Sequence, residues 1–189
     1  MFIDLTVLVT EEMVRSAGGN EKKALAGHLG THFDVMDKDF PLDYLRLKAH
    51  IFDVRSVVGR DITLEDIDIE QIENEMFIIF YTGYIDDVAY GSKAYFKEHP
   101  QLDEVLIEAL VEREVAIIGI DCAGIRRGTE HTPMDQYCAD RGAFVVENLC
   151  NLGELMRCTG GKVFTAYTFP VRYAAMTGLP CRIIAEVAD

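Results

Sequence analysis

Two helical segments, each followed at once by a short apolar run, constrain the fold of this chain most. LDEVLIEALVER at residues 102–113 places apolar residues at helical spacing and leads into VAIIGID at 115–121. PMDQYCADRG at 133–142 predicts a second helix and leads into AFVVEN at 143–148. A helix that runs directly into a buried strand is typical of α/β proteins with parallel pairing. The sequence therefore predicts an α/β fold with a partly parallel sheet.

Strands outnumber helices in the rest of the chain. Alternating or β-branched runs predict strands at 2–9, 51–59, 75–84, 162–173 and 181–188. This count favours a barrel-like mixed sheet in a layered β/β/α arrangement, with few flanking helices, over a doubly wound sheet. No linker, repeat or break in composition divides the 189 residues, so we expect a single domain over 1–189.

Charge and cysteine content narrow the classes of function. A formal net charge of −14 disfavours nucleic acid and anionic membranes as partners. The five cysteines form no CxxC pair and are odd in number, which is typical of reduced thiols. The N-terminal stretch lacks the basic region of a signal peptide, and no apolar run has the length of a membrane span. We expect a cytoplasmic protein.

His28, His32 and Asp34 form a dense group of metal-binding side chain types. In a helix, Asp34 would point away from the two histidines. In a straight strand the histidines would lie roughly 13 Å apart, too far to share an ion. A chain bent at Gly30 would bring all three together, because glycine tolerates such a kink. The spacing leaves two interpretations open, a metal site and an exposed polar loop.

Three ligands leave a metal site incomplete unless others come from elsewhere in the chain. His131 lies in a polar loop just before the second predicted helix. Glu147 follows a buried apolar run, where a carboxylate either is paired or coordinated or marks the exposed end of the strand. His50 and His99 are interpreted as ordinary surface or interface residues, and Asp121 as a functional side chain or a turn residue.

The segment HLGTHFDVMDK at 28–38 resembles the signature HxGTHxDxPxH of the Putative cyclase family, which includes bacterial kynurenine formamidases and isatin hydrolases. The resemblance continues through VAIIGIDCAG, the loop that carries His131, AFVVENLCNLGEL and FPVRYAAMTGLPCRIIAEV. It is weakest between residues 42 and 95. It implies the swivelling β/β/α fold and a homodimer or higher homo-oligomer.

The resemblance also implies a site for two divalent ions, Zn or Mn. His28, His32 and Asp34 match the ligands of one ion, and Asp34 is expected to bridge to a second ion held by His131 and Glu147. A shared carboxylate would partly neutralise two cations that otherwise repel at about 3.5–4 Å. The implied activity is arylformamidase-like hydrolysis of carbon–nitrogen bonds, in which a metal-activated hydroxide cleaves an amide, lactam or ester of a small molecule.

The chain departs from the signature at two positions, with Met36 in place of the Pro and Lys38 in place of the final His, the usual acid/base. Lysine has an ordinary pKa of about 10.4, which two nearby cations would lower. Lys38 is therefore either a catalytic acid/base or a solvent-facing residue between Asp37 and Asp39. Proton delivery by a general acid typically raises the rate by about 10²–10⁴-fold. Its loss slows the cleavage of amides more than that of esters or strained lactams. The alternatives are a metal-dependent binding protein without turnover, and a lyase or cyclase using the same site.

Overall fold

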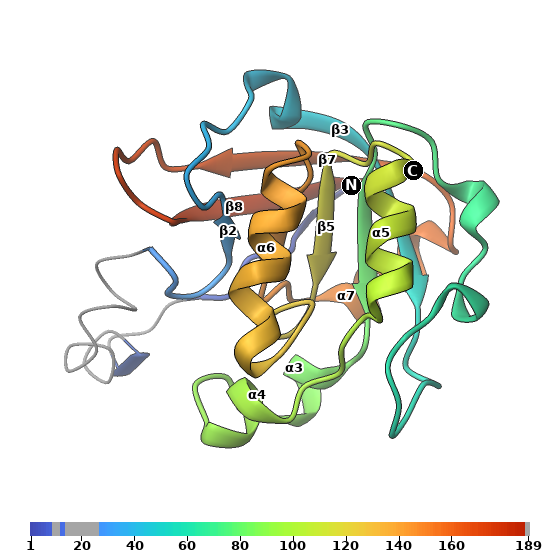
Figure 1. The fold of residues 1–189 in the computed structure, drawn as a ribbon. Helices are drawn as coiled ribbons and strands as arrows, with labels where there is room; N and C mark the ends of the chain where they lie inside the picture. Colours follow the sequence, from blue (N-terminus) through green and yellow to red (C-terminus); the bar gives the residue numbers. More distant parts are fainter. Residues whose placement is uncertain (9–11, 14–26, 188–189) are drawn as a thin grey trace.

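A mixed sheet of eight strands forms the centre of the computed structural model, which describes residues 1–8, 12–13 and 27–187 (Figure 1). Val9 and Ala188, at the ends of two predicted strands, lie outside the described residues. The strands are β1 (Phe2–Asp4), β2 (His32–Asp34), β3 (Arg46–Asp53), β4 (Phe77–Tyr81), β5 (Ile117–Ile120), β6 (Phe144–Glu147), β7 (Phe164–Pro170) and β8 (Gly178–Glu186). The α-helices in this part of the chain are α3 (Tyr84–Asp87), α4 (Lys93–Lys97), α5 (Glu104–Glu112), α6 (His131–Ala139) and α7 (Leu152–Thr159).

Seven of the strands close into a barrel. The order along the sheet is β1-β8-β2-β6-β5-β4-β3-β7, and pairing of β7 with β8 joins the two sides. Strands β3, β4, β5 and β6 run parallel, whereas the pairs made by β1, β2, β7 and β8 are antiparallel. The predicted α/β fold with a barrel-like mixed sheet is confirmed.

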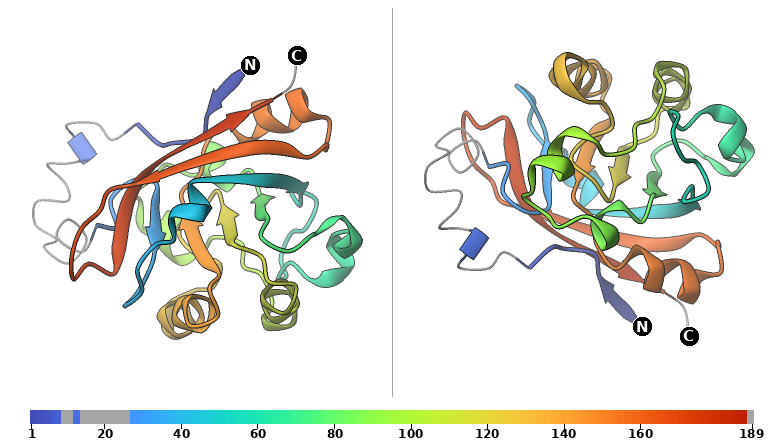
Figure 2. Two further views of the ribbon diagram at one scale, coloured as in Figure 1. Left: turned by 90° about the horizontal axis from the view of Figure 1, so that it is seen from above. Right: turned by 90° about the horizontal axis from the view of Figure 1, so that it is seen from below.

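Side chains that alternate along the parallel strands separate two cores. On β4, Phe77 and Ile79 face the barrel interior, while Ile78 and Phe80 belong to the layer beneath α5 and α6. Figure 2 shows these two helices on one side of the barrel. On β5, Gly119 lies so close to its neighbours that an added Cβ would come 2.6 Å from the ring of Phe77. The barrel interior therefore has no room for a side chain at this position.

Several elements differ from the predicted ones: α3 and α4 were not predicted, and β1 and β3 end at Asp4 and Asp53, before the predicted ends of those strands. Strand β3 begins at Arg46, five residues before the predicted start at 51. The prediction missed these residues because Arg46 and Lys48 are exposed and interrupt the apolar pattern. Helix α7 was not predicted, and Gly153 in its first turn has a low helix propensity. Its Leu152 and Leu155 nevertheless join the core of the barrel interior. None of the described helices is long and apolar enough to cross a membrane.

The expectation that His50 and His99 are surface or interface residues was wrong, because both are buried within the chain itself. His50 is 4% exposed and its ring lies 4.5 Å from that of Phe52. His99 is 1% exposed, and its Nδ1 lies 2.8 Å from the carbonyl oxygen of Pro100. Because that oxygen can only accept, Nδ1 of the neutral ring donates the hydrogen bond. Burial lowers the pKa of His99 to about 4.

This pKa predicts how His99 affects stability as a function of pH. Between about pH 6.5 and pH 4 the unfolded chain binds a proton at His99 that the folded chain does not, so stability falls as the pH falls. In His99→Gln this loss is absent, so the stability difference between variant and wild type should shrink by about 2 kcal/mol from pH 7.5 to pH 4.5. Chemical denaturation at both pH values measures it. A difference that does not change with pH would contradict the prediction.

Candidate metal centre

The candidate site lies where β2 and β6 meet helix α6. On β2, Phe33 faces the barrel interior, so the neighbouring His32 and Asp34 project from the opposite face of the strand. Strand β6 pairs with β2 in a register that places Glu147 directly across from His32. Directly paired residues share a face of the sheet. The alternation of β2 and this register therefore place His32, Asp34 and Glu147 together.

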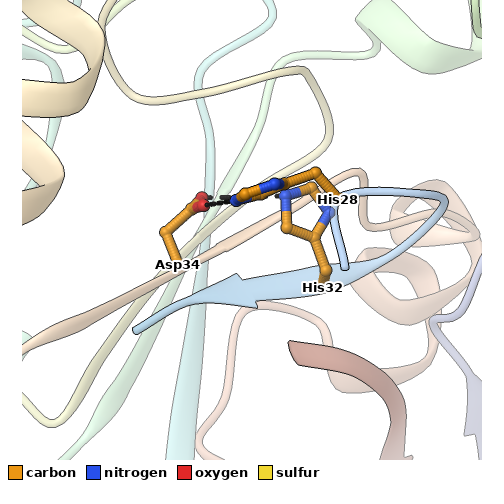
Figure 3. Close-up of side chains that lie close together, drawn as sticks. All are labelled: His28, His32 and Asp34. Carbon is orange, nitrogen blue, oxygen red and sulfur yellow. Dashed lines mark ion pairs between the residues drawn. The ribbon is translucent and has the colours of Figure 1, made fainter. Parts of the chain in front are cut away.

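A turn at Gly30 brings His28 to the same place. Gly30 has a φ of 74°, a left-handed conformation that favours glycine. Beyond this turn the Nε2 atom of His28 lies 2.9 Å from Oδ1 of Asp34, and the ring centroids of His28 and His32 are 4.9 Å apart. Figure 3 shows both imidazoles beside the Asp34 carboxylate. The bend predicted at Gly30 is confirmed.

Helix α6 contributes the side chains on the other side of the site. Its first residue, His131, has Nε2 at 3.4 Å from Oε1 of Glu147. One turn further, Asp135 has Oδ2 at 3.3 Å from the same nitrogen. Ligand atoms of Asp34, His131, Asp135 and Glu147 lie within 4.8 Å of one another, and so do those of His28, His32 and Asp34. Asp34 belongs to both groups.

Backbone carbonyls set the tautomers of two of the histidines. Nδ1 of His32 lies 2.9 Å from the Gly30 oxygen, and Nδ1 of His131 lies 3.0 Å from the Arg126 oxygen. A carbonyl oxygen only accepts, so each Nδ1 carries the proton, and in a neutral ring Nε2 presents its lone pair. Burial lowers the pKa of His32, which favours the neutral ring. Nitrogen lone pairs therefore face carboxylate oxygens, an arrangement that a cation between them would stabilise.

Two carboxylates of the site are buried although one oxygen of each lacks a hydrogen-bond donor. Asp34 is 3% exposed and Asp135 is 2% exposed, yet Oδ2 of Asp34 and Oδ1 of Asp135 accept no hydrogen bond from any described residue. Burial, and then the nearby charge of Asp34, raise the pKa of Asp135 well above its ordinary value. For Asp34 burial acts in the same direction, but the charge that His32 carries when protonated and the hydrogen bond from His28 outweigh it and lower the pKa of Asp34. A bound cation would satisfy the oxygens that lack a donor.

The distances fit a divalent cation. Two ligands each about 2.0–2.2 Å from a tetrahedral ion lie about 3.3–3.6 Å apart. In the second group, Nε2 of His131 lies 3.4 Å from Oε1 of Glu147 and 3.3 Å from Oδ2 of Asp135, and both separations fall inside this range. In the first group the separations lie on either side of it, at 2.9 Å between His28 and Asp34 and 3.8 Å between His32 and Asp34. The residues present at the site thus suit the metal centre that the sequence predicted.

The structure brings the five predicted ligands together and corrects one interpretation. Glu147 is 4% exposed, so it does not mark an exposed end of its strand. Asp135 was missed, although it follows His131 by four residues and so lies on the same side of a helix. The five ligands and Asp135 line a cavity of about 660 Å³.

Lys38 lies among different partners. Its Nζ is 2.7 Å from Oδ1 of Asp140 and 3.0 Å from Oδ1 of Asp37. The hydrogen bond to Asp140, and then that to Asp37, raise the pKa of Lys38, which is opposite to what a proton shuttle needs. Lys38 is also not among the described residues that line the cavity. Its acid/base role stays a prediction.

Asp121 has a structural function at the end of β5. Its carboxylate accepts hydrogen bonds from the Thr82 amide and hydroxyl at 3.0 and 2.6 Å and from the Gly83 amide at 2.7 Å. Burial raises its pKa to about 6. These bonds hold the turn that follows β4, which agrees with the second interpretation of this residue.

Comparisons with known proteins show the same fold. The family model described as Putative cyclase matches residues 3–126. A solved potential metal-dependent hydrolase with cyclase activity has a TM-score of 0.78 at 21% identity, over 100% of this chain and 98% of the other. A predicted metal-dependent hydrolase from Bacillus stearothermophilus has 0.71 at 20% identity, over 98% and 97%.

Isatin hydrolase A from Labrenzia aggregata has a TM-score of 0.70 at 18% identity, over 85% of this chain and 73% of the other. Among curated proteins, none matches the sequence. At these identities the solved structures establish the shared fold.

The packing of His131 predicts a test of the site. A Cβ added to Gly124 would lie 2.5 Å from Nδ1 of His131, so Gly124→Ala must displace the ring. We predict that this variant loses affinity for Zn²⁺ and Mn²⁺ by more than about tenfold, as when the partner of a ligand is removed. Isothermal titration calorimetry measures the affinity.

Gly128→Ala is the matched control, because Gly128 lies in the same loop, also has a positive φ, and has no atom within 4 Å of the added Cβ. We expect its metal affinity to equal that of the wild type. Equal affinity in both variants would show that His131 does not hold the metal.

Proposed function

The chain belongs to the Putative cyclase family, and from this membership and the geometry of the site we propose that it is a metal-dependent hydrolase. It cleaves an amide, lactam or ester bond in a small molecule. The observation that carries the proposal is the position of Asp34, whose carboxylate is common to two groups of potential ligands. The solved structures of a potential and a predicted metal-dependent hydrolase with the same fold support it.

The five predicted ligands divide between two ions, Zn or Mn. His28, His32 and Asp34 would hold one, and Asp34, His131 and Glu147 would hold the other. When bound, such ions polarise a carbonyl group and lower the pKa of water. The chain's own contribution is the orientation of the ligands, since the Gly30 and Arg126 carbonyls direct the Nε2 atoms of His32 and His131 toward the carboxylates.

The cavity suits a small substrate with an apolar body. Its volume of about 660 Å³ lies within the range of sites that bind small molecules, about 300–1,000 Å³. Met36, Phe96 and Ala123 provide an apolar wall beside the ligands, while Thr132 and Asn148 offer polar groups. The isatin hydrolase of the same fold supports a compact ring system as substrate.

Position 38 affects which bond is cleaved. The two ion pairs of Lys38, with Asp37 and Asp140, support the interpretation in which it does no acid/base chemistry. An amide nitrogen needs a proton to leave, whereas an alkoxide or the nitrogen of a strained ring needs it less. We therefore propose that esters and strained lactams are cleaved faster than linear formamides.

Turnover with added metal tests this function. The protein is stripped with a chelator, reloaded with ZnCl₂ or MnCl₂, and assayed on phenyl acetate, isatin and N-formylaniline. We expect metal-dependent hydrolysis of the first two compounds and slower hydrolysis of the formamide. Metal binding without turnover of any of them would support the alternative, a metal-dependent binding protein, and absence of metal binding would contradict both.

Paired lysine variants test the role of Lys38. Lys38→Met and Lys48→Met each remove an ammonium group that takes part in ion pairs; Lys38 is half-buried, and the exposed Lys48 pairs with Glu73 at 2.9 Å. We predict that both keep kcat within about threefold of the wild type. A loss of about 10²-fold or more in Lys38→Met alone, with a changed pH profile, would establish Lys38 as the acid/base instead.

A further inference from the structure

We infer that Asp135 is an additional metal ligand, which makes the second ion position rich in carboxylates and gives the two positions different metal preferences. The inference rests on the proposed function, because it assigns a role within the same metal centre. It concerns a residue that the signature at 28–38 and the five predicted ligands do not include.

The surroundings of Asp135 argue against a structural role. On α6 the buried residues are Asp135, Cys138 and Ala139, so the carboxylate lies on the side of the helix that faces the protein. A buried aspartate that serves the fold has hydrogen-bond donors for both oxygens, as Asp121 shows with its three. Oδ1 of Asp135 has no such donor among the described residues.

The geometry directs Asp135 to the second ion position. Its Oδ2 lies 3.3 Å from Nε2 of His131, and that nitrogen lies 3.4 Å from Oε1 of Glu147. Carboxylate oxygens of Asp34, Asp135 and Glu147 all lie within 4.8 Å of one another. Carboxylates of like charge that share one buried space repel unless a cation lies between them. A cation here would be reached by Asp135 as readily as by Glu147.

With Asp135 included, the two positions differ in chemistry. The first has two imidazoles and one shared carboxylate, from His28, His32 and Asp34, whereas the second has one imidazole and three carboxylates. Imidazole ligands suit Zn, and carboxylate oxygens suit Mn and Mg. We therefore expect the second position to bind Mn²⁺ in the presence of Zn²⁺ more readily than the first.

Asp135→Asn tests this assignment, with Asp140→Asn as the matched control. Asp140 is the C-cap residue of the same helix, and it pairs with Lys38 outside the cavity lining. Titration calorimetry with MnCl₂ and the electron paramagnetic resonance of bound Mn²⁺ report the sites without an assay of activity. We expect two ions per wild-type chain and per Asp140→Asn chain.

In Asp135→Asn we expect the affinity for one Mn²⁺ to fall by more than about tenfold, with a smaller fall for Zn²⁺. The other ion should bind as in the wild type. The melting temperature without metal should equal or exceed that of the wild type, because Oδ1 of Asp135 accepts no hydrogen bond from a described residue that the substitution would remove. Metal should then raise that temperature less than it does in the wild type.

Three results would overturn the inference. They are wild-type affinity for both ions in Asp135→Asn, an equal loss in Asp140→Asn, and a metal-free Asp135→Asn that melts well below the wild type or does not fold. The last result would show a structural carboxylate, and Asp135→Ser would check it with a smaller side chain. Absence of metal binding by the wild-type protein is a separate outcome, since it would defeat the proposed function itself.

Discussion

The central physical constraint on this site is that buried carboxylate groups lie directly beside the imidazole nitrogens of histidines. Asp34 lies at the point where β2, β6 and α6 meet, almost inaccessible to water, and one of its oxygens accepts no hydrogen bond from a described residue. Burial of carboxylates without donors opposes folding unless positive charge compensates it. Neutral imidazoles cannot supply that charge. A divalent cation can, and the separations between the ligand atoms correspond to those around one.

The fold explains how three distant parts of the chain reach this point. The closed barrel places β2 next to β6, and its interior takes Phe33, so the alternate side chains must face outward. Helix α6 covers that outer face and brings His131 with it (Figure 1). The left-handed turn at Gly30 then returns His28 to the carboxylate. Each step is a local property of the backbone, and only their combination forms the site.

Much of this arrangement could be predicted from the sequence. The helix and strand order indicated a mixed α/β sheet, and the kink needed at Gly30 followed from the reach of two histidines along a strand. His131 and Glu147 were candidates from their residue types and positions, but only the resemblance assigned them to the site, because no local pattern shows that β6 pairs with β2. The same limitation hid Asp135 and the burial of Glu147, His50 and His99, since tertiary packing decides which polar side chains are covered. Exposed Arg46 and Lys48 masked the start of β3 for a similar reason.

The central claim is that one carboxylate serves two cation positions. Anomalous diffraction from crystals of the protein soaked with ZnCl₂ and MnCl₂ tests it most directly, because the signal locates each metal independently of any assay. Two peaks, each about 2.0–2.2 Å from an oxygen of Asp34, would agree with the account. Ions bound elsewhere, or a single ion that Asp34 does not touch, would contradict it.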